Sequence, residues 1–374
     1  MKQRVRLAAA GAAALAAGAL VAGPASASAH GGGHGAVFVQ TDNTSGNSIA
    51  VYDRAPDGAL AAAGSYATGG LGGVLAGSAV DHLASQGSLA LDRRHGLLYA
   101  VNAGSDSLTV FKVHGDRLHA TQVTGSGGTF PVSVTTHGNL VYVLNARDGG
   151  SVQGYLRIGN HLIRVPSWNR GLGLDPTATP EFTHTPGQVS FTPDGRHLVV
   201  TTKANGNDID IFAVTRYGAL EGPTVYEDTD AVPFAVTYDA AGHLLVAEAG
   251  TNSVSTFRLG RDGTLTLLAT AATGQAATCW IAGTGRTFFA SNAGSATLSG
   301  YRAHADGQLT ATGAWSTDAG TVDASVTPND RFLYAQAGAA GNVDGFRIHP
   351  DGSLSPVGSV TVPGAAGGEG IVAE

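Results

Sequence analysis

Polar side chains recur at one position of this sequence, at the end of a short apolar run. The seven residues at that position are Thr41, Asn102, Asn145, Thr202, Glu248, Asn292 and Ala337. Asp42 and Lys203 follow the position directly, and Arg147 lies two residues after it. Lys203 and Glu248 belong to neighbouring repeats, where a cation and an anion predict either a binding site or a structural ion pair. Both alternatives are open at this point.

Polar residues also recur ahead of another set of apolar runs. Gln86, Gln188 and Asp323 stand there, and we expect them to face the same opening as Asn102 and Asn292, as ligand-binding residues. Both sets of polar residues also have a purely structural interpretation. Asn caps its own backbone and tolerates turn conformations, and polar side chains in a channel can serve as partners for internal water.

The elements that must position these residues form an internal repeat of about 45 residues, filled with strand-length alternating segments. In each repeat the second apolar run ends at the position described above. These runs are Ala36–Thr41, Leu97–Asn102, Leu140–Asn145, His197–Thr202, His243–Glu248, Thr287–Asn292 and Phe332–Ala337. The repeat predicts an all-β, seven-bladed β-propeller of four-stranded antiparallel blades.

Turn residues separate the runs. Clusters such as Pro193-Asp194-Gly195 precede the second run, and Asp-Gly pairs such as Asp351-Gly352 precede the outermost strand. The first repeat begins at its second strand, whereas Glu369–Glu374 is surplus after the last repeat. We therefore expect the C-terminal strand to complete the N-terminal blade and close the ring, which removes an open sheet edge.

Composition sets the domain limits. The 55 Gly among 374 residues suit an all-β chain rich in turns. Residues 1–29 combine Lys2, Arg4 and Arg6 with an apolar run and Ala27-Ser28-Ala29, which is typical of a secretory signal. We expect a flexible Gly/His tail over 30–35, one propeller domain over 36–374, and a secreted, extracellular protein.

Charge and cysteine content exclude several classes of function. Removing the signal leaves 18 Lys and Arg against 28 Asp and Glu, a net charge of about −10. This balance disfavours nucleic acid as a partner, and no second apolar stretch approaches membrane-spanning length.

The single Cys279 lies in an apolar run, which predicts a packing role rather than a nucleophile. No cofactor and no catalytic metal are expected, although His30 and His34, and the acidic run 227–230, are conceivable surface metal contacts.

Ligands of propellers bind where connections surround the channel mouth. Two connections between blades are long, Gly64–Gln86 and Gly159–Gly187, and both should fold over the same mouth.

Several phrases resemble the secreted branch of the lactonase family of seven-bladed propellers, which includes 6-phosphogluconolactonase and the 3-carboxymuconate cyclases. The phrases are Ser85–Leu89, Ala100–Ser105, Pro186–Gly195, Cys279-Trp280 and Ser291–Ser295, and the resemblance covers essentially all of Ala36–Glu374.

The resemblance implies opening or closing of a lactone ring at the channel mouth by a set of His, Arg and Glu. The family's His-Pro-His phrase is reduced here to His184, with Gln188 near the place of the second His. Lactone hydrolysis needs a base to activate water and donors to hold the oxyanion. His184 or Glu248 is the expected base, and Lys203, Arg147 or Gln188 the expected oxyanion partner.

Two functions follow as hypotheses. The first is a secreted lactonase-like hydrolase or cyclase acting on a small sugar-acid or muconate-type lactone. The second is a non-catalytic propeller that binds a small ligand or a protein on the same face. In both cases we expect a monomer that takes a small-molecule ligand or substrate, without nucleic acid or membrane.

Overall fold

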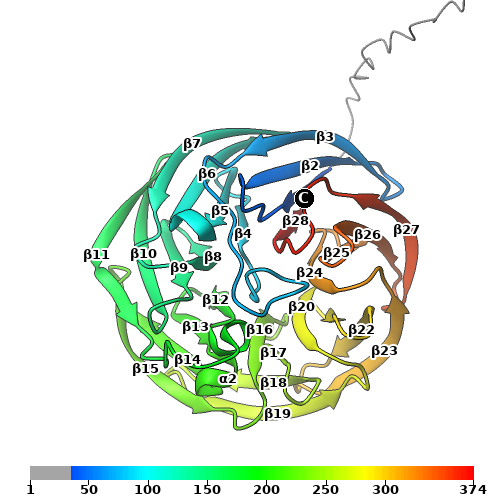
Figure 1. The fold of residues 1–374 in the computed structure, drawn as a ribbon. Helices are drawn as coiled ribbons and strands as arrows, with labels where there is room; N and C mark the ends of the chain where they lie inside the picture. Colours follow the sequence, from blue (N-terminus) through cyan, green and yellow to red (C-terminus); the bar gives the residue numbers. More distant parts are fainter. Residues whose placement is uncertain (1–34) are drawn as a thin grey trace, which may run out of the picture. The chain divides into compact units, whose positions relative to one another are not determined.

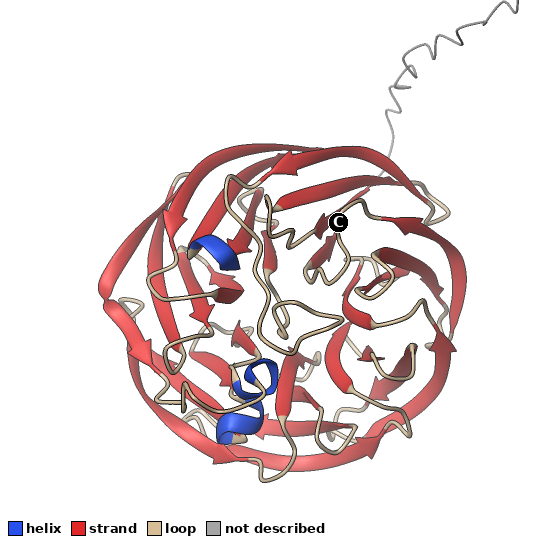
Figure 2. Ribbon diagram, in the orientation of Figure 1, coloured by secondary structure: helices blue, strands red, loops and turns tan. Residues whose placement is uncertain are grey.

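The repeated strand pattern folds as predicted into seven four-stranded antiparallel sheets arranged around a ring (Figure 1). The structure is a computed structural model, and it describes residues 35–374. The expected secretory signal and all but the last residue of the expected Gly/His tail lie outside the described residues. Almost all regular structure is strand, as Figure 2 shows.

The two inner strands of each blade are buried because neighbouring blades cover both of their faces. The innermost strands, from the first blade to the last, are β28 (Ile371–Ala373), β4 (Leu89–Asp92), β8 (Pro131–His137), β12 (Gln188–Phe191), β16 (Pro233–Tyr238), β20 (Thr278–Thr284) and β24 (Thr321–Val326). The second strands are β1 (Gly35–Gln40), β5 (Leu97–Asn102), β9 (Leu140–Asn145), β13 (His197–Thr201), β17 (Leu244–Glu248), β21 (Thr287–Asn292) and β25 (Phe332–Ala337).

Exposure increases toward the rim of the ring. The third strands are β2 (Ser48–Arg54), β6 (Ser107–His114), β10 (Ser151–Ile158), β14 (Asp208–Val214), β18 (Ser253–Leu259), β22 (Thr297–Ala303) and β26 (Asn342–Ile348). The outermost strands are β3 (Leu60–Ala67), β7 (Arg117–Gly125), β11 (His161–Gly171), β15 (Leu220–Glu227), β19 (Leu265–Ala272), β23 (Leu309–Ser316) and β27 (Leu354–Thr361). Solvent reaches one side of these outer strands, so their sequences carry small and polar residues.

Ring closure follows the prediction. β28 pairs antiparallel with β1, with Val37 opposite Ala373, and becomes the innermost strand of the first blade. The backbone ladder continues beyond the strand, where Gln40 N–H donates to the Gly370 carbonyl at 2.8 Å. The two ends of the described chain therefore hold one sheet together.

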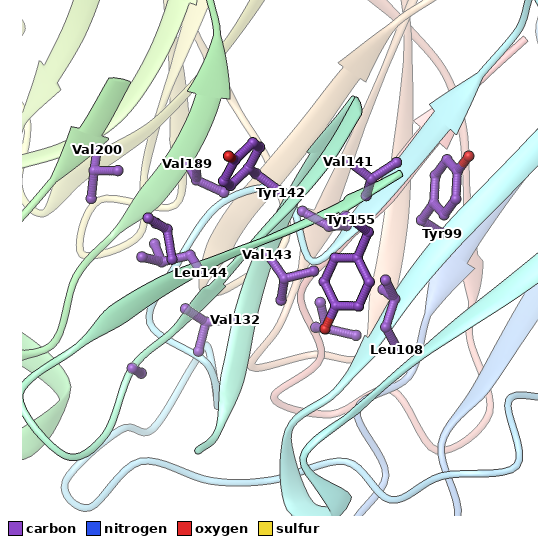
Figure 3. Close-up of a cluster of buried hydrophobic side chains, with 14 of the residues drawn as sticks. Tyr99, Leu108, Val132, Val141, Tyr142, Val143, Leu144, Tyr155, Val189 and Val200 are labelled. Carbon is purple, nitrogen blue, oxygen red and sulfur yellow. The ribbon is translucent and has the colours of Figure 1, made fainter. Parts of the chain in front are cut away.

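The core consists of apolar layers between adjacent blades. One large cluster joins the second, third and fourth blades, and Figure 3 shows part of it, including Tyr99, Tyr142 and Tyr155. Tyr142 also donates from its hydroxyl to the Gly218 carbonyl at 2.6 Å, which fastens its blade to the next. Each blade is stabilised by burial against its neighbours, at roughly 25 cal/mol per Å² of apolar surface.

The turns carry the expected chemistry. At the Asp351-Gly352 turn, the Asp351 carboxylate accepts the Ser353 N–H at 2.9 Å, and Gly352 has φ +86°, a conformation that favours glycine. Helix is confined, within residues 35–374, to three short segments: η1 (Ala103–Ser105), α1 (Glu181–His184) and α2 (Lys203–Gly206).

The two long connections are shorter than predicted, because outer strands extend into both ranges. β3 continues to Ala67, and β11 takes up His161–Gly171, with its register against β10 shifted between Gln153 and Tyr155. The connections that remain are 68–88 and 172–187, the second of which contains α1, and they meet where Ala76 N–H donates to the Glu181 carboxylate at 2.6 Å. In the described part of the chain, no helix has the length and apolar character needed to cross a membrane.

Candidate functional site

The β3–β4 connection, residues 68–88, runs across the centre of the ring (Figure 1), and we call it the channel plug. Its end is bonded to the opposite side of the ring. The Gln86 amide donates to the Ile281 carbonyl and accepts the Ile281 N–H, both at 2.9 Å. Trp280 Nε1 donates to the Ser85 carbonyl at 2.7 Å. Gln86, predicted as a ligand-binding residue, therefore holds the channel plug in place.

Lys203 is also used by the channel plug. Its ammonium, 1% exposed, donates to the carbonyls of Ala84 and Phe182, both at 2.6 Å, and to the Thr185 hydroxyl at 3.1 Å. Burial lowers the pKa of Lys203 to about 7, an effect that the nearby Asp81 carboxylate opposes. All three N–H donors of the ammonium are used by these contacts, so Lys203 has none left for a ligand.

Glu248 bonds to other residues than Lys203, and within residues 35–374 the two side chains form no ion pair, so the ion-pair alternative finds no counterpart in the structure. The Glu248 carboxylate is 4% exposed and accepts hydrogen bonds from the hydroxyls of Ser253 at 2.6 Å and Thr251 at 3.2 Å. Burial, followed by repulsion from Glu248, raises the pKa of Asp228 to about 7. Lys203 bonds instead to main-chain carbonyls of the channel plug and of the connection 172–187, and the repeat pattern contains no information on the path of either connection.

The Asn residues at the strand ends join strands within their own blades. The Asn102 amide donates to the hydroxyls of Ser107 at 3.2 Å and Thr109 at 2.9 Å. Asn292 repeats the arrangement with Thr297 at 3.1 Å and Ser299 at 3.0 Å. A Ser or Thr at alternate positions of the next strand is therefore the sequence signal for this structural role.

Gln188 and Asp323 bind backbone groups of adjacent inner strands. The Gln188 carbonyl oxygen accepts the Val236 N–H at 2.6 Å, and Asp323 accepts the Ile371 N–H at 3.2 Å. Burial raises the pKa of Asp323 to about 7. Glu369, which the sequence reading did not single out, lies beside Asp323, and burial followed by repulsion from Asp323 raises its pKa well above the usual range.

Arg147 and His184 are the two catalytic predictions that the fold brings together. They line one cavity of about 150 Å³ on the face where the channel plug meets residues 172–187. We call it the α1 pocket, and its lining residues are Ala146, Arg147, Asp148, Gly149, Leu174, Asp175, Pro176, Ala178, Glu181, His184 and Thr185. The turn after β9 supplies Arg147, whereas α1 supplies His184.

The hydrogen bonds of His184 define its tautomer. Nδ1 lies 2.9 Å from the Pro180 carbonyl oxygen, which can only accept, and 2.9 Å from the Thr183 hydroxyl, which can accept as well as donate, so a proton on Nδ1 satisfies both contacts. Nε2 then carries the lone pair, and no described residue forms a hydrogen bond with it. The imidazole is half-buried in the lining of the α1 pocket, which leaves Nε2 free to accept a proton from a bound molecule.

Glu181 holds Arg147 from the opposite wall and was missed at the sequence level. Arg147 Nε donates to Glu181 Oε1 at 2.6 Å, and a second guanidinium nitrogen donates to Oε2 at 3.2 Å. The guanidinium also lies 4.2 Å from the centre of the Phe130 ring. Arg147 and Glu181 are 34 positions apart in the sequence, a separation that gave no spacing signal for this contact.

Metal-ligating side chains and the thiol were the remaining groups that could do chemistry. Across residues 35–374, no three His, Cys, Asp or Glu side chains converge in a way that could hold a metal ion. Burial raises the pKa of the Cys279 thiol to about 12, so the thiol is protonated at neutral pH.

Solved structures with the same architecture include lactonases. A periplasmic gluconolactonase of Pseudomonas aeruginosa has a TM-score of 0.72 at 17% identity, over 91% of this chain and 98% of its own. Candidate 6-phosphogluconolactonases of Bacteroides fragilis and Bacteroides uniformis give TM-scores of 0.70 and 0.72 at 18% and 16% identity, over 91% of this chain and 97% and 99% of theirs. No family model matches the sequence. No curated protein matches it either. The chain thus shares its seven-bladed fold with these lactonase structures.

Proposed function

We propose that the α1 pocket hydrolyses a small lactone, with His184 as the base and Arg147 as the group that holds the oxyanion. One observation carries this proposal: two residues from different segments of the chain, the turn after β9 and the helix α1, line the same cavity, and each is suited to one half of the reaction. The lactonase names of several proteins with this fold support the choice of reaction.

The chemistry follows from the free Nε2 of His184. That nitrogen takes a proton from water as the water oxygen bonds to the lactone carbonyl carbon. The carbonyl oxygen gains negative charge, and guanidinium N–H groups of Arg147 not used by Glu181 stabilise it. When the bond to the ring oxygen breaks, the imidazolium returns its proton to that oxygen, and the product is an open hydroxy acid. The reverse sequence closes such a ring.

The place of action is part of the proposal. The basic, apolar N-terminal segment that ends in Ala27-Ser28-Ala29 supports export, and one protein with this fold is described as periplasmic. We infer a secreted enzyme that acts on a sugar-acid or muconate-type lactone.

The experiment is hydrolysis of a panel of aldonolactones by the purified protein, compared with buffer. His184→Ala should lower kcat at least about tenfold, since a general base typically contributes a hundredfold or more. His161→Ala is the matched control, because His161 is exposed on β11 and outside the α1 pocket. Equal rates for the wild type and His184→Ala would contradict the assignment of the base.

A second function, binding without turnover on the same face, is favoured by one contact. Glu181 already neutralises Arg147, which weakens the guanidinium as an oxyanion partner. Saturable binding of a lactone by protein that does not open it would support this second function.

A further inference from the structure

The α1 pocket has an excess of negative charge despite containing Arg147. Asp148, Asp175 and Glu181 line it together with that single arginine and His184. An acidic lining repels anionic ligands, and only a cation able to pair with the anion could offset the repulsion. The availability of Arg147 therefore decides whether the pocket accepts an anion.

Glu181 occupies Arg147 by a two-point contact. The distances are 2.6 Å from Nε to Oε1 and 3.2 Å from the second nitrogen to Oε2, the geometry in which guanidinium and carboxylate match best. The hydrogen bond from Arg147 lowers the pKa of Glu181, so its carboxylate is ionised at neutral pH. Glu181 thus fills the face of the guanidinium that a phosphate or carboxylate ligand would need.

Glu181 is itself fixed in this position. Its Oε2 accepts the Ala76 N–H of the channel plug at 2.6 Å, and α1 carries its backbone. The Phe130 ring lies 4.2 Å from the guanidinium carbon and restricts the other partner. An anionic ligand would have to displace a carboxylate held by two separate elements, while Asp148 and Asp175 repel it.

We propose that Glu181 determines the ligand charge that the α1 pocket accepts: by holding Arg147 it excludes phosphorylated and carboxylated ligands and leaves the pocket to neutral polyhydroxy compounds. Neutral hydroxyl groups are suited to this lining because carboxylates accept hydrogen bonds from them. The assignment rests on the proposed lactonase function and deepens it, since of the two lactone classes it admits the neutral sugar-acid lactones and excludes the muconate-type lactones, which carry a carboxylate.

Binding measurements test the proposal without relying on turnover. Inorganic phosphate and glucose 6-phosphate serve as anionic probes and glucose as the neutral one, each titrated by calorimetry or NMR. We expect Glu181→Gln to bind the anionic probes at least about tenfold more tightly than the wild type, the gain typical of one charge-assisted contact. Its affinity for glucose should change little.

The matched control is Asp148→Asn, which removes one negative charge from the same lining but leaves the contact between Arg147 and Glu181 intact. Asp148 has φ +57°, a conformation that Asn also tolerates. A gain for Glu181→Gln alone, abolished in the double variant with Arg147→Met, supports the proposal. An equal gain in anion affinity in Asp148→Asn overturns it. So does an unchanged anion affinity in Glu181→Gln, provided that the melting temperature of this variant matches that of the wild type.

The outcome is separable from that of the lactonase assay. Loss of anion exclusion in Glu181→Gln would stand even if no lactone were opened. Conversely, turnover that depends on His184 would stand even if Glu181→Gln failed to gain anion binding.

Discussion

Replacing Asp42 by asparagine should stabilise the protein at alkaline pH and change its stability little at acidic pH. Asp42 is fully buried beside the channel plug, where its carboxylate accepts hydrogen bonds from the Gln40 amide at 2.6 Å and the Glu369 N–H at 2.8 Å. Burial raises the pKa of Asp42 to about 7, and repulsion from Asp81 adds to the effect. Glu369 is the second carboxylate that faces it.

The sign follows from proton linkage. Between about pH 4 and pH 7, Asp42 is protonated in the native state and ionised in the unfolded state. The free energy of unfolding therefore falls as pH rises through that range. A shift of roughly three pKa units corresponds to about 4 kcal/mol in total, of which roughly 2–3 kcal/mol falls between pH 5 and pH 8. The asparagine side chain does not ionise, so this fall in the free energy of unfolding is absent from the Asp42→Asn variant.

The substitution is conservative in geometry. Asp42 has φ +50°, which asparagine tolerates, and Gln40 Oε1 has no partner among the described residues. A flip of the Gln40 amide lets this oxygen accept from the new asparagine side chain. We therefore expect no large steric cost at either pH.

The assay is equilibrium denaturation in urea followed by tryptophan fluorescence at pH 5 and pH 8. The difference in unfolding free energy between Asp42→Asn and the wild type should increase by roughly 2–3 kcal/mol from the lower pH to the higher. Asp116→Asn, at an exposed turn, is the control and should show no such increase. The same difference at both pH values would refute the reasoning.

Two further predictions concern stability. Deleting Gly370–Glu374 removes β28 and exposes the edge of β1, so the melting temperature should fall by many degrees; a truncated protein that melts like the full chain would disprove the role of β28. Lys203→Met leaves the carbonyls of Ala84 and Phe182 without their donor, and urea denaturation should show a loss of roughly 1–3 kcal/mol. No loss would mean that Lys203 is not a structural residue.

The channel region shows where prediction from sequence reached its limit. The sequence singled out Lys203 and Glu248 because they depart from the repeat pattern. It did not indicate the residues to which they bond. Lys203 bonds to Ala84, 119 residues away. A connection without periodicity carries no local signal for its path, because distant contacts determine that path.

The seven blades, their four strands and the closure by the C-terminal segment can all be read from the chain, because alternation and turn residues act between near neighbours. Arg147 and His184 also emerge there as candidates for chemistry. The folded ring is what brings these two into one pocket and adds Glu181 to Arg147. It also sends the channel plug across the centre, where Gln86 and Ile281, 195 residues apart, bond to each other. Such contacts depend on the packing of whole blades, since the side chains meet only after the ring has formed.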